Sequence, residues 1–343
     1  MTDPGNPHQL TVAVTGPTGD IGRSLLRALE RSREIERIVA MARRPWDPLA
    51  AGLQKTEYRQ GDVLDAASVQ QLAAGADVLV HLAFLILGSL SDTQRVNLDG
   101  SRNVFEAAVT CGCKRLVYAS SVAAYGFHDE NPPLLTEDIP PRGTKRHYYS
   151  EQKAELERVL HDVLQGSGVD AYVFRPCIVA GPDASALLQS IPYIRLSERM
   201  PAAVRRALEQ LPLMAPVLPD FGVSFQLVHH DDVATAFRAA VLGRGHPGVY
   251  NLAAPGTLTI PDLAAALGWY SVPVPELALD AVAEIMARLP FVPAEAQWIE
   301  TLRTPVVMDT GKARRELRWR PSHDALQTLR AMVDCLRSEQ LIR

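Results

Sequence analysis

The sequence has few cysteines and no long apolar run. Four cysteines occur among 343 residues, and the nearest two, Cys111 and Cys113, lack the Cys-x-x-Cys spacing of zinc and redox sites. We therefore expect buried thiols and a reducing, cytoplasmic location. No apolar run approaches the ~18 residues that span a bilayer, and the polar residues 1–9 do not resemble a signal peptide. These absences predict a protein that does not insert into a membrane.

Basic residues are too sparse and scattered to form a nucleic-acid surface. The 35 Lys and Arg residues are matched by 39 Asp and Glu residues, for a formal net charge of -4. Pairs such as Arg43-Arg44 stand alone, so nucleic acid is not an expected partner. Aromatic residues make up only 6%, but the 47% hydrophobic share is ordinary for a globular protein. The length suits one large domain, or a core domain with a smaller one.

Short runs of β-branched residues alternate with stretches of helical periodicity before Pro182. Strands are predicted at residues 10–15, 37–42, 77–84, 115–121 and 171–176, and helices at 21–31, 96–108 and 147–165. Alternation of this kind is typical of a parallel sheet that helices cover on both faces. The predicted fold class is therefore α/β, with a Rossmann-like doubly wound parallel sheet.

After Pro182 the sequence becomes apolar and is punctuated by prolines. We predict a smaller, discontinuous, mostly helical substrate-binding domain over the carboxyl end of the sheet, where ligands of open α/β folds bind. A strand-like run at residues 224–230 is expected to rejoin the sheet. The predicted boundaries are residues 1–182 for the dinucleotide-binding domain, rejoined by about 224–255 and 304–343, and residues 183–223 and 256–303 for the substrate-binding domain.

Three glycines directly follow the first predicted strand. Gly16, Gly19 and Gly22 are spaced Gly-x-x-Gly-x-x-Gly. Glycines let a turn fold sharply and let backbone amides approach a ligand, and the next helix presents its positive N-terminus to a pyrophosphate. At the start of a strand–helix–strand pattern, this turn predicts dinucleotide binding.

The end of the second predicted strand bears on the choice between NAD(H) and NADP(H). An NAD site usually has a carboxylate there for the ribose diol, but this chain has Arg43 and Arg44, with no acid before Asp47. A guanidinium pairs well with a 2'-phosphate. We therefore prefer NADP(H) as the cofactor and keep NAD(H) as the alternative. The other interpretation of the two arginines is that both are solvated surface residues.

The chain resembles the extended short-chain dehydrogenase/reductase family, also called the NAD-dependent epimerase/dehydratase family, over nearly its whole length. Each motif alone is weak, but the order and spacing of the motifs are specific. The motifs are the glycine turn at 15–22, GDVLD at 61–65, HLA at 81–83, VNLDGSRNVFEAA at 96–108, YASSVAAYG at 118–126, Tyr149-x-x-x-Lys153, FRPCIVAGP at 174–182, VHHDDVATAF at 228–237, GVYNLAAP at 248–255 and DTGKARRELRWRP at 309–321.

The resemblance implies roles for the matching residues. The implied catalytic residues are Ser121, Tyr149 and Lys153. The expected cofactor-binding residues are Gly16, Thr18, Gly19, Asp20, Ile21, Gly22, Arg43, Arg44, Asp62, Val63, Leu82, Ala83, Ala119, Tyr149, Lys153, Pro176 and Ile178. The expected substrate contacts are Phe84, Ser121 and Tyr149. Ser120 competes with Ser121 for the catalytic role, and Asn97 would have a supporting one. The resemblance also suggests a homodimer through helices near residues 100 and 155.

Tyr149 and Lys153 are one helical turn apart, so both side chains would face the site. A free phenol has a pKa of ~10 and is a poor base near pH 7. A neighbouring ammonium favours the phenolate, so we expect Lys153 to lower the pKa of Tyr149. Tyr149 would then exchange a proton with a carbonyl oxygen during hydride transfer, while Ser121 hydrogen-bonds to that oxygen. Tyr148 points roughly 100° away around the helix and is expected to pack.

Two departures from the family pattern concern the substrate. Nucleotide-sugar members usually carry an asparagine where this chain has Ile178, and an arginine in the segment that here reads PDFGVSF at 219–225. Both departures bring the chain closer to the branch of ketosteroid, dihydroflavonol and cinnamoyl-type reductases. The segments at 83–90 and 211–219 are apolar, and apolar walls select apolar ligands, although these segments could simply pack on each other.

The leading hypothesis is an NADP(H)-dependent oxidoreductase that reduces a ketone or oxidises a secondary alcohol of a hydrophobic small-molecule substrate. One alternative is a nucleotide-sugar epimerase or dehydratase. Another, from a different class, is a non-catalytic protein that senses NADP. An intact set of Ser121, Tyr149 and Lys153 favours chemistry over sensing.

A metal site is not expected, although His229, His230, Asp231 and Asp232 are consecutive. Adjacent histidines on a strand point to opposite faces and would not converge on one ion. The family resemblance instead implies a structural aspartate in this turn.

Overall fold

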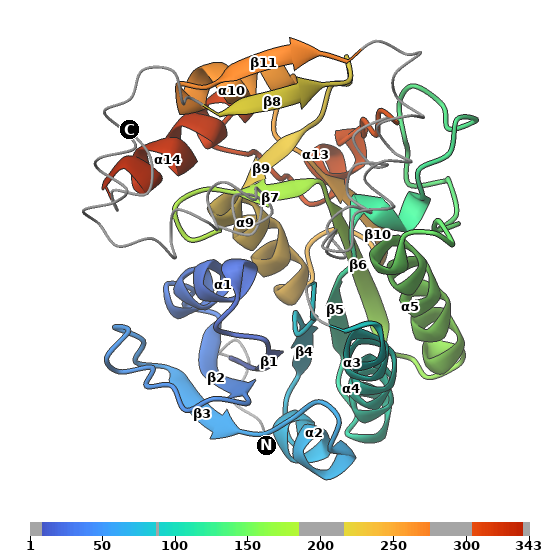
Figure 1. The fold of residues 1–343 in the computed structure, drawn as a ribbon. Helices are drawn as coiled ribbons and strands as arrows, with labels where there is room; N and C mark the ends of the chain where they lie inside the picture. Colours follow the sequence, from blue (N-terminus) through green and yellow to red (C-terminus); the bar gives the residue numbers. More distant parts are fainter. Residues whose placement is uncertain (1–8, 87–88, 185–215, 275–303, 339–343) are drawn as a thin grey trace.

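The computed structural model describes residues 9–86, 89–184, 216–274 and 304–338 (Figure 1). The first half of the chain contains β1 (Leu10–Thr15), α1 (Asp20–Glu30), β2 (Ile35–Ala42), β3 (Thr56–Gln60), α2 (Ala66–Ala73), β4 (Val78–His81), α3 (Leu90–Gln94), α4 (Gly100–Thr110), β5 (Arg115–Ala119), α5 (Tyr148–Leu164) and β6 (Asp170–Pro176). A π-helical turn at Arg95–Asp99 joins α3 to α4, and a 3-10 helix at Val122–Tyr125 follows β5. The later elements are β7 (Ile178–Ala180), β8 (Val217–Asp220), β9 (Leu227–His229), α9 (His230–Val241), β10 (Gly248–Leu252), α10 (Ile260–Leu267), β11 (Tyr270–Pro273), α13 (Gly311–Glu316) and α14 (Ala325–Ser338).

Seven parallel strands form the central sheet, in the order β10, β6, β5, β4, β1, β2, β3. The chain moves outward from β1 through β2 and β3 in one direction, and from β4 through β5, β6 and β10 in the other. The direction therefore switches between β1 and β4, which pair from Val12 with Val78 to Thr15 with His81. Ligands of such sheets bind at the carboxyl ends of the strands at this switch point. The predicted doubly wound α/β fold is confirmed.

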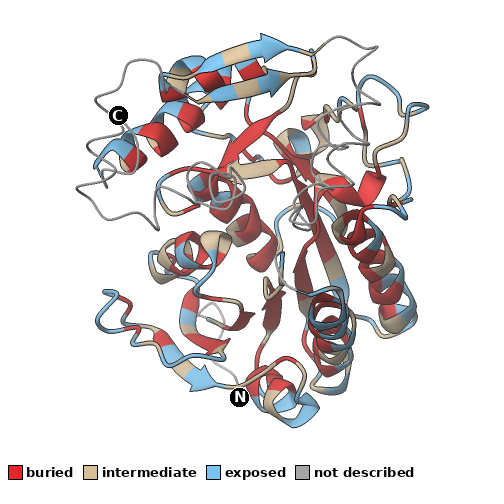
Figure 2. Cartoon of the chain, viewed as in Figure 1, coloured by how far each residue is buried: buried red, intermediate tan, exposed pale blue. Residues whose placement is uncertain are grey.

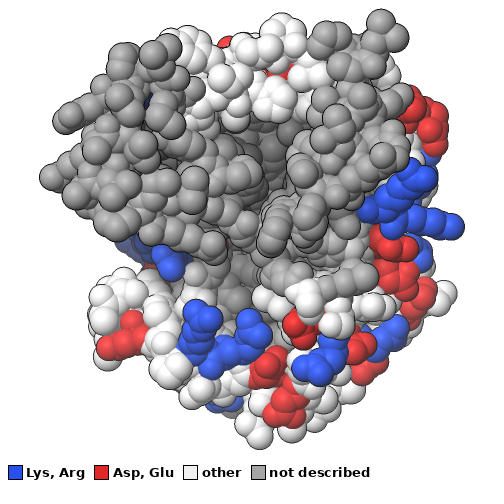
Figure 3. Space-filling view, in the orientation of Figure 1, with Lys and Arg blue, Asp and Glu red and all other residues white. Residues whose placement is uncertain are grey.

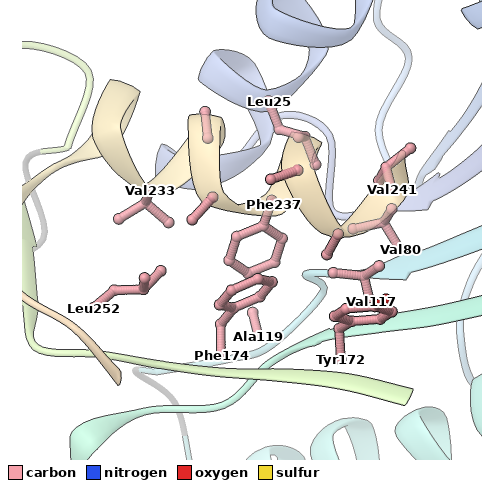
Figure 4. Close-up of a cluster of buried hydrophobic side chains, with 14 of the residues drawn as sticks. Leu25, Val80, Val117, Ala119, Tyr172, Phe174, Val233, Phe237, Val241 and Leu252 are labelled. Carbon is pink, nitrogen blue, oxygen red and sulfur yellow. The ribbon is translucent and has the colours of Figure 1, made fainter. Parts of the chain in front are cut away.

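The inner strands are buried on both faces, as their near-continuous apolar sequences require (Figure 2). Alternate residues of β1 enter different clusters, because successive side chains of a strand point to opposite faces. Val12 and Val14 belong to the cluster that includes residues of α1 and α9, and Ala13 to the cluster that includes residues of α2, α4 and α5. In the first cluster Phe174 of β6 stacks on Phe237 of α9, with ring centres 4.5 Å apart (Figure 4).

Two short sheets lie outside the central one. β7 pairs with β9, and β8 pairs with β11, in both cases in parallel. A third apolar cluster joins residues of β7 and β9 to residues of α10 and α14. The β8–β11 pair places residues 217–220 beside residues 270–273.

The run at residues 224–230 does not rejoin the central sheet, so that sequence-based prediction is wrong. Leu227–His229 form β9 and pair with β7, whereas β10 returns to the sheet beside β6. The alternation of apolar and polar residues shows which face of a strand is buried, but it does not show which other strand pairs with it. Most of the predicted substrate-binding domain falls on residues 185–215 and 275–303, outside the described residues.

Candidate active site

The turn between β1 and α1 depends on the absence of two side chains. Gly16 has a φ of +70°, and a Cβ on it would lie 2.7 Å from the amide nitrogen of Ala83, just after β4. A Cβ on Gly22 would lie 2.3 Å from the carbonyl oxygen of Gly16. The turn can fold this closely only because both residues are glycines. Gly19 caps α1 without a side chain, so the first amides of the helix keep their affinity for an anion.

A buried histidine joins the ends of β1 and β4 behind this turn. His81 Nδ1 lies 2.7 Å from Thr15 Oγ1, and His81 Nε2 lies 2.8 Å from Ser101 Oγ on α4. Burial, with a smaller effect from the charge of Lys153, lowers the pKa of His81 to about 3. The ring is therefore neutral at pH 7 and serves as a fixed link between the two strands.

A pocket opens at the switch point between β1 and β4. It is formed by the glycine turn, by residues at the ends of β2 and β3, and by the segment after β4. The lining residues are Gly16, Thr18, Gly19, Met41, Ala42, Arg43, Gly61, Asp62, Val63, Leu82, Ala83, Phe84, Leu85 and Val96. Sequence reasoning missed Met41, Ala42, Gly61, Leu85 and Val96, although most of them lie close in sequence to predicted residues.

Other predicted cofactor residues are not among those that line the pocket. Asp20, Ile21 and Gly22 form the first turn of α1, and Arg44 follows Arg43 after β2. Ala119 and Pro176 are at the carboxyl ends of β5 and β6, and Ile178 is at the start of β7. Tyr149 and Lys153 are on α5.

Ser121 and Tyr149 meet beyond the carboxyl end of β5. Ser121 caps the 3-10 helix, where its Oγ accepts the N–H of Ala123 at 3.2 Å. Tyr149 lies in the first turn of α5, where the nearby Ser121 side chain acts to lower the pKa of its phenol. The structure therefore brings together the two hydroxyl groups that the resemblance implies for the reaction.

Lys153 follows Tyr149 by one turn of α5, and its side chain is buried. Its Nζ donates to the carbonyl oxygen of Ala119 at 2.7 Å and lies 3.7 Å from the centre of the Phe84 ring. Burial lowers the pKa of Lys153 to about 7, while the charge of Glu157 raises it. The amine of Lys153 therefore gains or loses its proton near pH 7.

The expectation that Lys153 lowers the pKa of Tyr149 is wrong for this arrangement. Burial raises the pKa of Tyr149, and the hydrogen bond with Ser121, which lowers it, has the smaller effect. The ammonium lies 5.8 Å from the centre of the Tyr149 ring and donates to Ala119. Tyr149 is therefore a neutral phenol at pH 7, with its ring partly exposed.

Ser120 faces a buried ion pair. Its Oγ donates to Glu157 Oε1 at 2.5 Å, and Arg175 donates to the two oxygens of Glu157 at 2.9 and 2.6 Å. The guanidinium of Arg175 lies over the ring of Tyr125, 4.3 Å from its centre. These contacts occupy Ser120 and leave Ser121 as the serine beside Tyr149. Sequence reasoning missed Glu157, because a glutamate on an amphipathic helix is ordinarily solvated.

Asn97 supports the segment that follows β4. Its Oδ1 accepts the N–H of Leu85 at 2.8 Å, and its Nδ2 donates to the Leu85 carbonyl at 3.0 Å and to Gln152 Oε1 at 2.8 Å. Tyr148 donates to the carbonyl of Ile86, one residue further on, and is otherwise buried. Both contacts fit the supporting and packing roles expected for these residues.

The rings of His229 and His230 lie against each other, so the prediction that they point to opposite faces is wrong. β9 ends at His229 and α9 begins at His230, and the two ring centres are 4.2 Å apart. With Asp231 they form a group whose geometry could hold a metal ion. The ring nitrogens have partners, because His229 Nδ1 accepts the N–H of Asp231 at 3.2 Å, and His230 contacts Ser24 Oγ at 2.7 Å and the N–H of Asp183 at 3.2 Å. These contacts give the two histidines a structural role at the start of α9.

Basic and acidic side chains are interspersed along the lower part of the face seen in Figure 3. This distribution agrees with the scattered charges of the sequence. Within the described ranges, the helices are all too short or too polar to cross a membrane.

The chain has a Rossmann-like sheet with a glycine turn at its switch point, and a serine, a tyrosine and a lysine at the carboxyl end of that sheet. This combination defines a class of proteins that bind a dinucleotide. A model of the NAD dependent epimerase/dehydratase family matches residues 12–253. The chain therefore belongs to the NAD dependent epimerase/dehydratase family, whose members are NAD(P)-dependent enzymes of the short-chain dehydrogenase/reductase type. The family that the sequence resembles is confirmed.

The chain is similar to the 3 beta-hydroxysteroid dehydrogenase type 7 of Homo sapiens, with 34% identity over 179 residues, 49% of this chain and 47% of that protein. It is also similar to the ceramide reductase of Caulobacter vibrioides, with 30% identity over 239 residues, 68% of this chain and 62% of that protein. The chain thus spans less than two thirds of the length of either relative. The UDP-glucuronic acid 4-epimerase of Bacillus cereus in complex with NAD shares the fold, with a TM-score of 0.70 and 18% identity over 96% of this chain and 99% of that one.

Proposed function

We propose that this protein is an NADP(H)-dependent oxidoreductase that reduces a ketone, or oxidises a secondary alcohol, of a hydrophobic small molecule. The observation that carries the proposal is the placement of the Tyr149 phenol beside Ser121 and one helical turn from the Lys153 amine, at the carboxyl end of the sheet. The names of two relatives, a hydroxysteroid dehydrogenase and a ceramide reductase, support oxidoreductase chemistry on a lipid-like molecule.

The pocket fits a dinucleotide. Gly16 and Gly19 of the glycine turn line the pocket without side chains, and the N-terminus of α1 offers amides to a pyrophosphate. Arg43 lines the same pocket and supplies a guanidinium for a 2'-phosphate. The nicotinamide cofactor, when bound, supplies or accepts the hydride. Lys153 would hold the cofactor's nicotinamide ribose, as the family resemblance implies.

Tyr149 is the proposed acid and base. Because burial raises its pKa, the phenol is protonated at pH 7, which is the form that donates a proton to the oxygen of a ketone. Ser121 would donate a hydrogen bond to that oxygen while negative charge develops on it. After the proton has moved to the product alcohol, the phenolate that remains on Tyr149 takes a proton back from solvent before the next turnover. Oxidation of the alcohol would run these steps in reverse.

Apolar side chains near the proposed reaction site support a hydrophobic substrate. Phe84 lines the end of the pocket nearest Tyr149, and Ile178 occupies the position where nucleotide-sugar members of the family usually have asparagine. Apolar walls with few polar groups favour apolar ligands, and the polar groups fix the orientation.

Turnover assays on two substrate classes test the proposal. The purified protein should consume NADPH with steroid or long-chain ketones and leave nucleotide sugars unchanged. Turnover confined to a nucleotide sugar would overturn the substrate class. Tight cofactor binding with no turnover of either class would favour the NADP-sensing alternative.

Replacement of Tyr149 by phenylalanine tests the proton donor. Y149F should lower kcat by roughly 10²–10⁴-fold, the usual contribution of a positioned acid or base, and should bind NADPH nearly as well as the wild type. Tyr172→Phe is the matched control, because its hydroxyl donates to the Gly245 carbonyl and has no part in the proposed site, and it should retain its turnover. Equal activity of Y149F and the wild type would show that another group donates the proton.

A further inference from the structure

We propose that Phe84 is a positioning residue for the catalytic pair, and that its ring holds the Lys153 ammonium by a cation–π contact while it packs against the Tyr149 ring. The inference rests on the proposed function for the roles of Tyr149 and Lys153 in the reaction. Phe84 lies where the two parts of the site meet, because it lines the dinucleotide pocket and contacts both side chains of α5.

The contact with Lys153 is the shortest of three. Lys153 Nζ lies 3.7 Å from the centre of the Phe84 ring, 5.2 Å from that of Tyr118 and 5.8 Å from that of Tyr149. An aromatic face carries partial negative charge and attracts a cation, most strongly when water is excluded. An ammonium has three N–H groups to satisfy, and one of those on Lys153 donates to Ala119. The Phe84 ring therefore compensates part of the cost of burying this charge.

The contact with Tyr149 orients the second member of the pair. The Phe84 and Tyr149 rings are nearly perpendicular, at 86°, with centres 5.4 Å apart. Perpendicular packing is a favoured geometry for two aromatic rings. One side chain therefore sets the position of the amine and limits the rotation of the phenol.

Phe84 can act in this way because its own segment is fixed from outside the catalytic pair. Asn97 hydrogen-bonds with both the N–H and the carbonyl of Leu85, and Tyr148 donates to the carbonyl of Ile86. These contacts hold the backbone directly after Phe84. The position of the ring is thus set by the π-helical turn and by α5.

Several titratable groups surround the Lys153 amine. Glu157, on the same helix, favours the charged amine. His81 of β4 is kept neutral by burial, and burial also keeps Tyr118 of β5 protonated. Tyr149 is likewise a neutral phenol. Phe84 and Glu157 therefore act together against the burial that brings the pKa of Lys153 to about 7.

Two substitutions of Phe84 distinguish the effect of its aromatic face on the ammonium from the effect of its apolar packing. Phe84→Leu keeps an apolar side chain but removes the π face, and Phe84→Tyr keeps the face. The measurement is an NMR titration of the protein grown with 13C-lysine, with the Lys153 signal assigned from Lys153→Arg. In F84L the pKa of Lys153 should fall by about 0.5–1.5 units, the shift that corresponds to a typical cation–π contact. In F84Y it should stay near the wild-type value.

The same variants should show a matching change in the pH profile. The ammonium is charged below its pKa, so activity that depends on this charge is lost as the pH rises through that value. A lower pKa in F84L should move the alkaline limb of kcat/KM to lower pH by the same amount. A merely structural effect would lower kcat without moving this limb.

Two results would overturn the inference: the same pKa for Lys153 in F84L as in the wild type, or a fall in F84Y as large as in F84L. Melting curves show whether F84L is folded, and Phe84→Met provides the same comparison if it is not. Failure of the wild type to turn over any substrate would refute the proposed function, and the NMR comparison would still decide whether the ring holds the ammonium.

Discussion

At the scale of single residues, two adjacent arginines after β2 have different surroundings. Both side chains are exposed, but Arg43 lines the pocket and Arg44 is not among its lining residues. The carbonyl of Arg43 accepts from Gln60 Nε2 at 3.1 Å, and that of Arg44 accepts from the Tyr58 hydroxyl at 2.8 Å. Their backbone positions are therefore fixed, and only Arg43 is placed where it lines the pocket. We propose that, if NADP(H) binds, its 2'-phosphate would contact Arg43 and not Arg44.

Arg43→Ala should weaken the binding of NADPH far more than that of NADH. Loss of a charge-assisted hydrogen bond costs about 1.5–3 kcal/mol, which corresponds to roughly a 10- to 150-fold rise in the Kd for NADPH. The Kd for NADH, which lacks the 2'-phosphate, should change little. Titration calorimetry with each cofactor measures both values.

Arg44→Ala is the matched control for this prediction. It removes the same charge from the next residue, so general electrostatic attraction falls equally in both variants. NADPH binding to this control should stay close to that of the wild type. Equal losses for NADPH and NADH in Arg43→Ala would show that Arg43 does not recognise the 2'-phosphate.

At the scale of elements, two glycines of the β1–α1 turn differ in the space available for a side chain. A Cβ on Gly22 would lie 2.3 Å from a backbone oxygen, whereas the nearest atom to a Cβ on Gly19 is 3.6 Å away. Gly22→Ala should therefore lower the free energy of unfolding by about 1–3 kcal/mol, because the turn must move to relieve the overlap. Urea unfolding without cofactor measures this change.

Gly19→Ala controls for the effect of adding a methyl group. Its Cβ meets only an ordinary contact, so the free energy of unfolding should change by less than about 0.5 kcal/mol. Cofactor binding can still fall in this variant, since Gly19 lines the pocket. If the two variants had the same free energy of unfolding, the close approach of Gly22 to Gly16 would not affect stability.

Whether a strand could be predicted from the sequence depends on whether its residues are buried in the fold. β1, β2, β4, β5 and β6 could be predicted because they are buried on both faces, which requires apolar, β-branched runs. β3 lies at the edge of the sheet and reads TEYRQ, so it has no such run and was not predicted. The π-helical turn before α4 was also missed, because its residues continue the helical periodicity.

The site was predictable where a motif fixes local geometry, and not where distant segments meet. The glycine turn and the spacing of Tyr149 and Lys153 set positions within one or two turns of chain. The orientation of the Lys153 amine depends on Phe84 and Ala119, which come from other elements. No pattern in the sequence specifies those contacts, and none specifies the burial that raises the pKa of Tyr149, so the direction of that shift was predicted wrongly.

At the scale of the whole molecule, one aspartate joins the C-terminal segment to the core. Asp232 of α9 is 2% exposed, and its carboxylate accepts the N–H of Ser322 at 2.7 Å and both the N–H and Nδ1 of His323 at 3.1 and 3.0 Å. Its carbonyl also accepts from Trp319 Nε1 at 2.8 Å. These contacts hold the link between α13, which packs near β10, and α14, which packs near β9. The structural aspartate implied by the family resemblance is thus found in this turn.

Asp232→Ala should loosen this link and lower the free energy of unfolding by about 2–5 kcal/mol, because it leaves buried donors without an acceptor. Denaturant unfolding measures the loss, and hydrogen exchange should show faster exchange at Ser322 and His323 than in the wild type. The neighbouring Asp231, whose side chain is 54% exposed and lies 3.6 Å from Arg27, provides the control. Asp231→Ala removes the same charge from the first turn of α9, together with its contacts to His230 and Arg27, and should cost no more than about 2 kcal/mol, the upper range for an acid at a helix N-terminus. If the two variants lost similar free energy of unfolding, the effect of Asp232 would come from its charge near the helix. Its three contacts to the C-terminal segment would then contribute little.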